Sequence, residues 1–553
     1  MTRNTLVQGL MRLPGGDKAL LRGFVVMSLL TLGLGLVYGA LTGFARAGFV
    51  ELDPALAYRM LTLHGVTIFF YWLYFAQSAF VLILASVYTE GAGAVAWRPL
   101  AWLGFALMVA GFGLSELMPT LGAVMLYDGQ PDLIGYDMTK GGFFYLGYLL
   151  LAAGLFLVAT SAIATALKPR FEGTIETWSS ISFASVAWAG LLMVSALAAI
   201  NAFLPAAWWA FGFGAEPAAY TMSWHVLFHN VHYLPLMATV VIWYVLVEVM
   251  AGVKSIFGQR FSKIVFASYL VFVPPTSLYH MFLEPNLADA VRVTGSLLSL
   301  FIGVPTVLVF LIVVASLETH ARAHGARGLF GWMRMLPWRN PAMSAIGMAV
   351  VNTALGGALA FVLIQEKLAP LLSDTFFVPG YFHFLTLGTV TLTFIAALMY
   401  VIPGLTGRPL WNPGLLAKLP YVMTFGLLIF GAAGIVAGYQ GVPRRLFDVS
   451  YEGSAPEIWG TLMAIVGIGA VFMTIALAVF VFGLVMTLFA RAREAGAADL
   501  PVVSWGGVAT AGQAAWVGPL AVVVLIAGMY VFTALGFELM QSLPLVASGD
   551  AGH

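Results

Sequence analysis

The sequence predicts an all-α membrane protein whose helices cross the lipid bilayer many times. Hydrophobic residues make up 61% of the 553-residue chain and charged residues only 9%, whereas soluble domains carry about 25% charged residues. The mean hydropathy is +0.95. Apolar runs of about 20 residues, the length that spans a bilayer, recur thirteen times. A soluble globular enzyme is therefore excluded, and the lipid bilayer is the first expected partner.

The apolar runs define the predicted transmembrane helices in chain order. Charged residues are concentrated in the short connectors, so we expect one membrane domain over residues 1–553 without a linker. No small-residue cleavage site accompanies the first run, which favours a retained helix over a signal peptide. The predicted spans are 20–45, 57–88, 98–127, 142–167, 179–205, 220–251, 261–284, 292–319, 341–366, 380–403, 416–440, 457–489 and 514–541.

Lysine and arginine residues set the predicted orientation, because they collect on the cytoplasmic side of a membrane. With the N-terminus inside, only seven of the 25 basic residues fall in outer segments. We therefore expect the N-terminus inside and the C-terminus outside. The net charge of +1 gives no bulk attraction for nucleic acid, so no such partner is expected. The seven outer residues are Arg46, Arg59, Lys140, Arg292, Lys367, Arg444 and Arg445.

The histidines are the main candidates for a functional site. The chain has no cysteine, which excludes iron–sulfur clusters, covalently attached c-type haem and thiolate copper centres within it. Polar residues inside a membrane are costly and are by default functional, and imidazole binds haem iron, copper and zinc. Six of the nine histidines lie within predicted spans, in the outer half of the bilayer. They are His64, His225, His229, His232, His280 and His383.

Three of these histidines share the sixth predicted span, in the segment SWHVLFHNVHYLP. Helical spacing places His225, His229 and His232 within an arc of about 60°, and His280 on the next span could complete a metal site. An aromatic packing face is the alternative interpretation of this stripe. Three histidines are a costly way to pack a helix in a membrane, so we expect a metal, with copper preferred.

A series of short motifs resembles subunit I of the heme-copper oxidase superfamily, specifically the B-type cytochrome c oxidases. Their order, spacing and membrane depth agree over nearly the whole chain. The motifs are LTLHG at 62–66, His229 with Tyr233 four residues on, PPTSLYH at 274–280, VPTVLVFLIVVASLE at 304–318, VPGYFH at 378–383 and GVPRR at 441–445.

The resemblance implies a low-spin haem, of b type, held between His64 and His383. Two axial imidazoles leave no open coordination position, which suits electron transfer. Arg444 and Arg445 match the arginine pair that holds the haem propionates in this family. The planar guanidinium fork is well suited to binding carboxylates.

The family's reactive site is only partly retained. Tyr381 occupies the position of the high-spin haem ligand, and the family's histidine pair reads Tyr279-His280. His229 matches the remaining copper ligand, and Tyr233 matches a tyrosine that is crosslinked to a copper ligand in the oxygen reductases. The three tyrosines are therefore candidate catalytic residues.

The placement of Tyr381 determines how many haems the chain can hold. Tyr381 and His383 are two residues apart on one predicted helix, so they should point about 160° from each other. We therefore expect Tyr381 to face a compartment that neighbours the low-spin haem.

Three hypotheses follow from the altered site. In the first, Tyr381 ligates a second, high-spin haem as phenolate, and copper is held by His229, His280 and either His225 or His232. In the second, that haem is lost and a copper or other metal occupies the histidine cluster. In the third, the centre is vestigial and the chain is a b-type cytochrome relay. The second is preferred here, with one haem per chain.

The expected function is that of a membrane redox enzyme subunit in a respiratory-type complex. Electrons would pass through the low-spin haem to the remodelled metal site, with dioxygen the acceptor that the resemblance implies. Nitric oxide reductase-like activity and a non-catalytic relay are the alternatives, and a non-redox cation transporter or channel is a hypothesis of a different class. We expect an electron-donating subunit with an outer copper or c-haem domain, cytochrome c or quinol as donor, and the bacterial cytoplasmic membrane as location.

Overall fold

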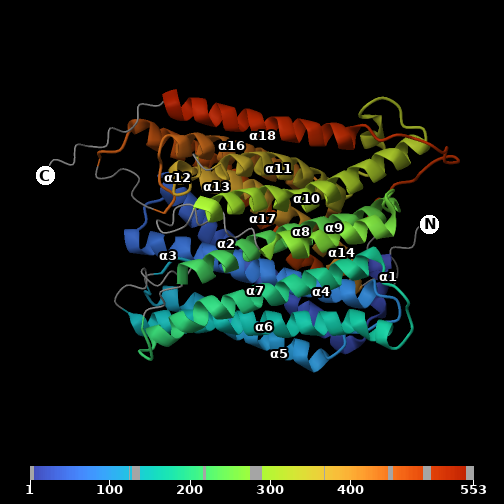
Figure 1. The fold of residues 1–553 in the computed structure, drawn as a ribbon, viewed down its shortest axis with the longest axis horizontal. Helices are drawn as coiled ribbons and strands as arrows, with labels where there is room; N and C mark the ends of the chain where they lie inside the picture. Colours follow the sequence, from blue (N-terminus) through green and yellow to red (C-terminus); the bar gives the residue numbers. More distant parts are fainter. Residues whose placement is uncertain are drawn as a thin grey trace.

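Long helices lie side by side along one direction in the computed structural model (Figure 1). It describes residues 5–123, 125–127, 137–215, 220–274, 289–365, 368–445, 453–489 and 500–542, with the backbone alone at 220–230, 232, 289, 291–292, 295–296, 298–300, 302 and 540. These residues form helices and no strand, and one isolated bridge joins Thr375 to Pro443. The all-α membrane fold expected from the sequence is confirmed.

The helices follow the chain in a simple order, with two π-helical segments (η1 and η5) and one 3-10 turn (η4). The helical elements are α1 Thr5–Arg12, α2 Gly15–Arg46, α3 Pro54–Gly65, η1 Val66–Trp72, α4 Leu73–Val87, α5 Arg98–Thr120, α6 Met138–Phe171, α7 Ser180–Ala210, α8 Tyr220–Ala251, α9 Gly258–Phe272, α10 Asp289–Ala323, η4 Gly331–Met335, α11 Pro341–Leu363, α12 Ala369–Leu372, α13 Phe377–His383, η5 Phe384–Thr391, α14 Leu392–Thr406, α15 Pro413–Leu416, α16 Leu419–Tyr439, α17 Glu457–Phe489 and α18 Val517–Ser542.

Twelve helices in the described part of the chain are long and apolar enough to cross a membrane. Each matches one of the thirteen predicted spans. The thirteenth, predicted at 261–284, overlaps α9 (Gly258–Phe272), and residues 275–284 of that predicted span lie outside the described residues. The chain is thus an integral membrane protein, and the bounds of its helices follow from the lengths of its apolar runs.

The core of the bundle surrounds the two helices that carry His64 and His383. In the span Pro54–Val87, 89% of the most apolar window is buried within the protein, and in Phe377–Thr406 the share is 83%. The corresponding share for α18 is only 6%, and this helix lies at the edge of the bundle beside α10 and α11 (Figure 1). The histidines therefore sit on the most enclosed helices, where a polar side chain needs partners.

Both of these central helices change to π-helix directly after the histidine. In the first, α3 ends at Gly65 and η1 follows; in the second, α13 ends at His383 and η5 follows. The ordinary α-helix is thus interrupted at equivalent places in the two central helices.

The α3 helix starts with a cap in which the Asp53 carboxylate accepts hydrogen bonds from the amides of Ala55 and Leu56.

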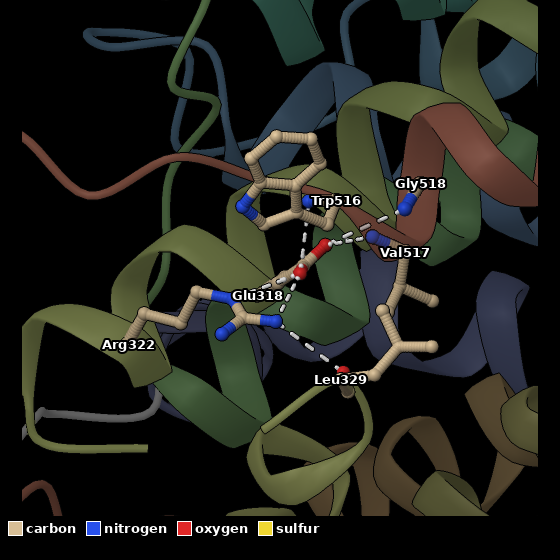
Figure 2. Close-up of polar contacts among 6 residues, drawn as sticks. All are labelled: Glu318, Arg322, Leu329, Trp516, Val517 and Gly518. Atoms are coloured by element: carbon tan, nitrogen blue, oxygen red, sulfur yellow. Dashed lines mark hydrogen bonds and ion pairs between the residues drawn. The ribbon is translucent and has the colours of Figure 1, made fainter. Parts of the chain in front are cut away.

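A buried carboxylate fastens the peripheral α18 to the bundle (Figure 2). Glu318 of α10 is fully buried, and it accepts hydrogen bonds from the amides of Trp516 (2.9 Å) and Val517 (2.7 Å) at the start of α18. Arg322, one turn further along α10, lies 2.8 Å from the same carboxylate. A negative charge at a helix N-terminus satisfies amides that lack intrahelical partners. This contact attaches a helix that otherwise buries little surface.

Candidate functional site

A cavity of about 650 Å³ lies between the central helices, large enough for a sizeable cofactor. Most of its walls come from α2, α3, η1, α13, η5, α16 and α17, and α4, α8, α11, α12 and the segments that follow α5, α12 and α16 complete them. The described site residues predicted from the sequence all border this one cavity. They are His64, His383, Tyr233, Tyr381, Arg444 and Arg445.

The His64 ring is fixed by the neighbouring helix α2. Its Nδ1 lies 2.8 Å from the carbonyl oxygen of Gly35. A carbonyl can only accept, so Nδ1 carries the proton and Nε2 remains available to bind a metal. Gly39, one turn further on, packs flat against the ring, because a Cβ there would stand 2.5 Å from Cε1 of His64. The glycines of α2 thus allow a close approach that orients the imidazole.

The His383 ring is held in the same manner. Its Nδ1 lies 2.7 Å from the carbonyl oxygen of Pro379 one turn earlier, and its ring centre lies 4.7 Å from that of Phe430 on α16. Proline has no amide hydrogen, but its carbonyl still accepts a hydrogen bond. Both imidazoles border the same cavity. Two histidines on different helices therefore each leave Nε2 available as a metal ligand, with the other ring nitrogen already hydrogen-bonded.

Positive charge gathers at one rim of the cavity. The Arg444 guanidinium lies 3.0 Å from Asp374, while its buried Nε has no hydrogen-bond partner among the described residues. Arg445 borders the cavity beside it. A buried donor without a partner is costly, and a carboxylate of a bound cofactor would satisfy it.

Arg46, at the end of α2, is a cavity residue whose role the sequence analysis did not identify. It is 5% exposed, and its Nη atoms donate to the carbonyl oxygens of Pro443 (2.5 Å) and Arg444 (3.0 Å). Its guanidinium also lies 5.0 Å from the ring centre of Phe376. Arg46 thus holds the segment that carries the other two arginines. In the sequence, the feature that pointed to this role is that Arg46 is one of the few basic residues in the predicted outer segments.

Tyr381 and Tyr233 border the same cavity as the histidines. Tyr381 is buried on α13, with its ring centre 5.8 Å from that of Phe377. Tyr381 and His383 both line this cavity, and the expectation that Tyr381 faces a compartment that neighbours the low-spin haem stays a prediction.

The predicted copper site lies largely outside the described residues. Tyr279 and His280 fall in the undescribed range 275–288, and the side chains of His225, His229 and His232 on α8 are likewise not described. Within the described ranges, no three His, Asp or Glu side chains gather closely enough to hold a metal ion. The copper ligands therefore remain a prediction from the sequence.

Fold and cavity together define a class: a helical membrane protein that presents two half-buried imidazoles and a cationic rim to a large internal space. The family model described as "Cytochrome C and Quinol oxidase polypeptide I" matches residues 19–472. The chain belongs to this family. Membership supports a membrane redox oxidase role, with haem and copper as the cofactors that the family implies.

Several known proteins are similar to the chain. Cytochrome c oxidase subunit 1 of Thermus thermophilus is 29% identical over 515 residues, which cover 87% of this chain and 86% of the relative. A probable quinol oxidase subunit 1 of Staphylococcus aureus is 24% identical over 71% of this chain and 58% of the relative. A solved heme-copper terminal oxidase dimer superposes with a TM-score of 0.80 at 21% identity, covering 95% of this chain and 92% of that one. This last similarity supports the fold.

Proposed function

We propose that the chain binds one low-spin haem of b type between His64 and His383 and passes electrons through it to a metal site on α8. The observation that supports the proposal is that the two imidazoles form the same type of hydrogen bond. Each donates Nδ1–H to a backbone carbonyl and keeps Nε2 for a ligand, and both border one large cavity. Metal-binding histidines usually donate their second ring N–H to a carbonyl or carboxylate in this way, which fixes the ring and its tautomer.

The rim arginines fit a cofactor with two carboxylates. Arg444 has a buried Nε without a partner in the described part of the chain, and Arg445 borders the same space. Guanidinium groups remain charged and bind carboxylates with two parallel hydrogen bonds. We assign the haem propionates to these two residues, with Arg46 supporting the segment that carries them.

Within this site the protein supplies ligands, orientation and exclusion of water. A haem held by His64 and His383 would supply one-electron transfer. Apolar side chains such as Phe69, Phe382 and Phe430 line the cavity and keep it dry. His64 and His383 sit on different helices, so any relative movement of these helices would strain the ligation.

We further propose copper as the metal on α8, held by His229 and His280 with His225 or His232. Neutral imidazoles are suitable copper ligands, and three of these residues share one helix. Dioxygen is the proposed acceptor. Tyr381 stands where the family has its high-spin haem ligand, which favours one haem per chain and makes a non-catalytic relay the second candidate.

Partners and location follow from the relatives. The relatives include a cytochrome c oxidase subunit and a probable quinol oxidase subunit, so either donor fits this chain. We propose that electrons enter at the outer side from a second subunit with a copper or c-haem domain. The bacterial cytoplasmic membrane is the proposed location.

Counting cofactors tests the proposal. One haem and one copper per purified complex support a redox enzyme, and one haem without copper supports the relay. Two haems overturn the one-haem assignment, and a complex without haem overturns the whole proposal.

Two variants test the copper ligands separately from the haem. His229→Ala and His280→Ala should each lower bound copper while leaving the low-spin haem spectrum intact. His320→Ala is the matched control, because His320 packs against His324 and Trp505 at the far end of α10. Loss of copper in the control, or full copper in both site variants, contradicts the ligand assignment.

A further inference from the structure

The two proposed haem-ligand helices share an unusual local structure. After each histidine the helix becomes a π-helix, over Val66–Trp72 in one and Phe384–Thr391 in the other, and then returns to α-helix. These are the π-helical segments of the described chain. A π-turn is rare and widens the helix, so it offsets the residues before it from those after it. Both histidines thus precede a π-helical segment, which offsets them from the α-helix that follows it.

A buried hydrogen bond joins the ends of the two π-segments. Trp72 is the last residue of η1 and Thr391 is the last of η5, and Trp72 Nε1 donates to Thr391 Oγ1 at 3.2 Å. Each residue follows its histidine by eight positions. Trp72 is fully buried and Thr391 is 3% exposed, so water does not compete for the bond.

Each π-segment is also braced from outside. The Thr67 hydroxyl lies within hydrogen-bond distance of the carbonyl oxygen of Leu63 in its own helix and of the Glu116 carboxylate on α5. In the second segment, Thr389 Oγ1 lies 3.0 Å from the hydroxyl of Thr353 on α11 and bonds the carbonyl of Phe384. Side-chain bonds of this kind occupy carbonyls that a π-turn leaves without their usual α-helical partners. The segments are therefore fixed to their surroundings, and Trp72–Thr391 is the bond between them.

We propose that Trp72 and Thr391 are positioning residues that set the relative placement of His64 and His383. One iron can accept both Nε2 atoms only at a fixed separation and ring orientation. The hydrogen bond fixes the two helices about two turns below the histidines, and the π-turns transmit that placement to the ligands. This inference depends on the proposed haem site and adds the residues that control its geometry.

A substitution at Trp72 distinguishes an effect on the positions of the histidines from an effect of direct contact with the haem. Thr391 borders the cavity, so a change there could act on the haem directly, whereas Trp72 is absent from the cavity lining. Trp72→Phe removes the donor and keeps an aromatic ring against Phe394, whose ring centre lies 6.0 Å away. Thr391→Val removes the acceptor with little change of shape, and Thr391→Ser restores it.

A second Trp–Thr pair supplies the matched control. Trp243 of α8 donates to Thr393 of α14 at 2.8 Å, both are fully buried, and the bond does not join the π-segments. Trp243→Phe therefore removes the same type of bond two residues away from Thr391. It should affect folding to a similar degree without moving the histidines.

The test is the low-spin ferric EPR spectrum and the haem midpoint potential of the purified holoprotein. Trp72→Phe and Thr391→Val should shift the largest g value and the potential in the same direction, and the double variant should equal either single one. Thr391→Ser and Trp243→Phe should match the wild type. An unmoved signal in Trp72→Phe, or an equal shift in Trp243→Phe or Thr391→Ser, overturns the inference. A wild-type protein without a bis-imidazole signal instead overturns the proposed haem site.

Discussion

Replacing Arg46 with methionine should release the segment that carries Arg444 and Arg445. Methionine keeps the aliphatic stem but removes the donors to the carbonyls of Pro443 and Arg444. Hydrogen bonds that involve a charged group contribute about 1.5–3 kcal/mol each. Relief from burying a guanidinium offsets part of this loss. We therefore expect the free energy that holds the segment closed to fall by about 2–4 kcal/mol.

Hydrogen exchange reports this opening at two amides. The Phe376 amide donates to the carbonyl of Val442 (2.7 Å), and the Arg444 amide donates to that of Asp374 (3.0 Å), so both exchange only when the two segments separate. Because 1.36 kcal/mol corresponds to a tenfold change, exchange should accelerate about 30- to 900-fold. The haem should also dissociate more readily.

Arg22→Met is the control, since Arg22 lies on the same helix. It is exposed and donates only to the carbonyl of Lys18 in its own helix. Exposed substitutions change stability by about 0.5 kcal/mol or less, so exchange at Phe376 and Arg444 should change by about twofold at most. The reasoning fails if Arg46→Met leaves both amides protected, or if Arg22→Met exposes them equally.

Four further substitutions have defined outcomes. His64→Ala or His383→Ala should abolish the low-spin optical signal because each removes an axial ligand, and an unchanged α band in either would refute the assignment. Tyr381→Phe should leave the haem count and any high-spin ferric signal unaltered, whereas loss of a high-spin signal would reveal a phenolate-bound second haem. Glu318→Gln should lower the stability of the α18 attachment by about 1.5–3 kcal/mol, seen as faster proteolysis of residues 500–516; unchanged proteolysis would show that the carboxylate charge contributes little (Figure 2).

The positions of the membrane helices were predictable because each depends on one continuous apolar run. The predicted span 457–489, for example, coincides with the bounds of α17. Membrane depth and the family motifs also predicted that His64 and His383 share a site, and both border one cavity. These features depend on local composition or on short motifs.

Other features depend on contacts between distant segments and leave little trace in the sequence. Arg46 acquires its role because the end of α2 meets a segment that begins almost 400 residues later. The Nδ1 partner of His383 is one helical turn away, but that of His64 is a carbonyl on another helix. The π-turns shift backbone hydrogen bonds by one residue, which apolar periodicity does not reveal.

Near-infrared magnetic circular dichroism of the oxidised wild-type protein, combined with a haem count, addresses the ligation of the iron in a single sample. The proposed site predicts one haem per chain, with the charge-transfer band of ferric haem bound by two imidazoles. A protein without haem, or a haem with only one nitrogen ligand, would contradict the assignment of His64 and His383.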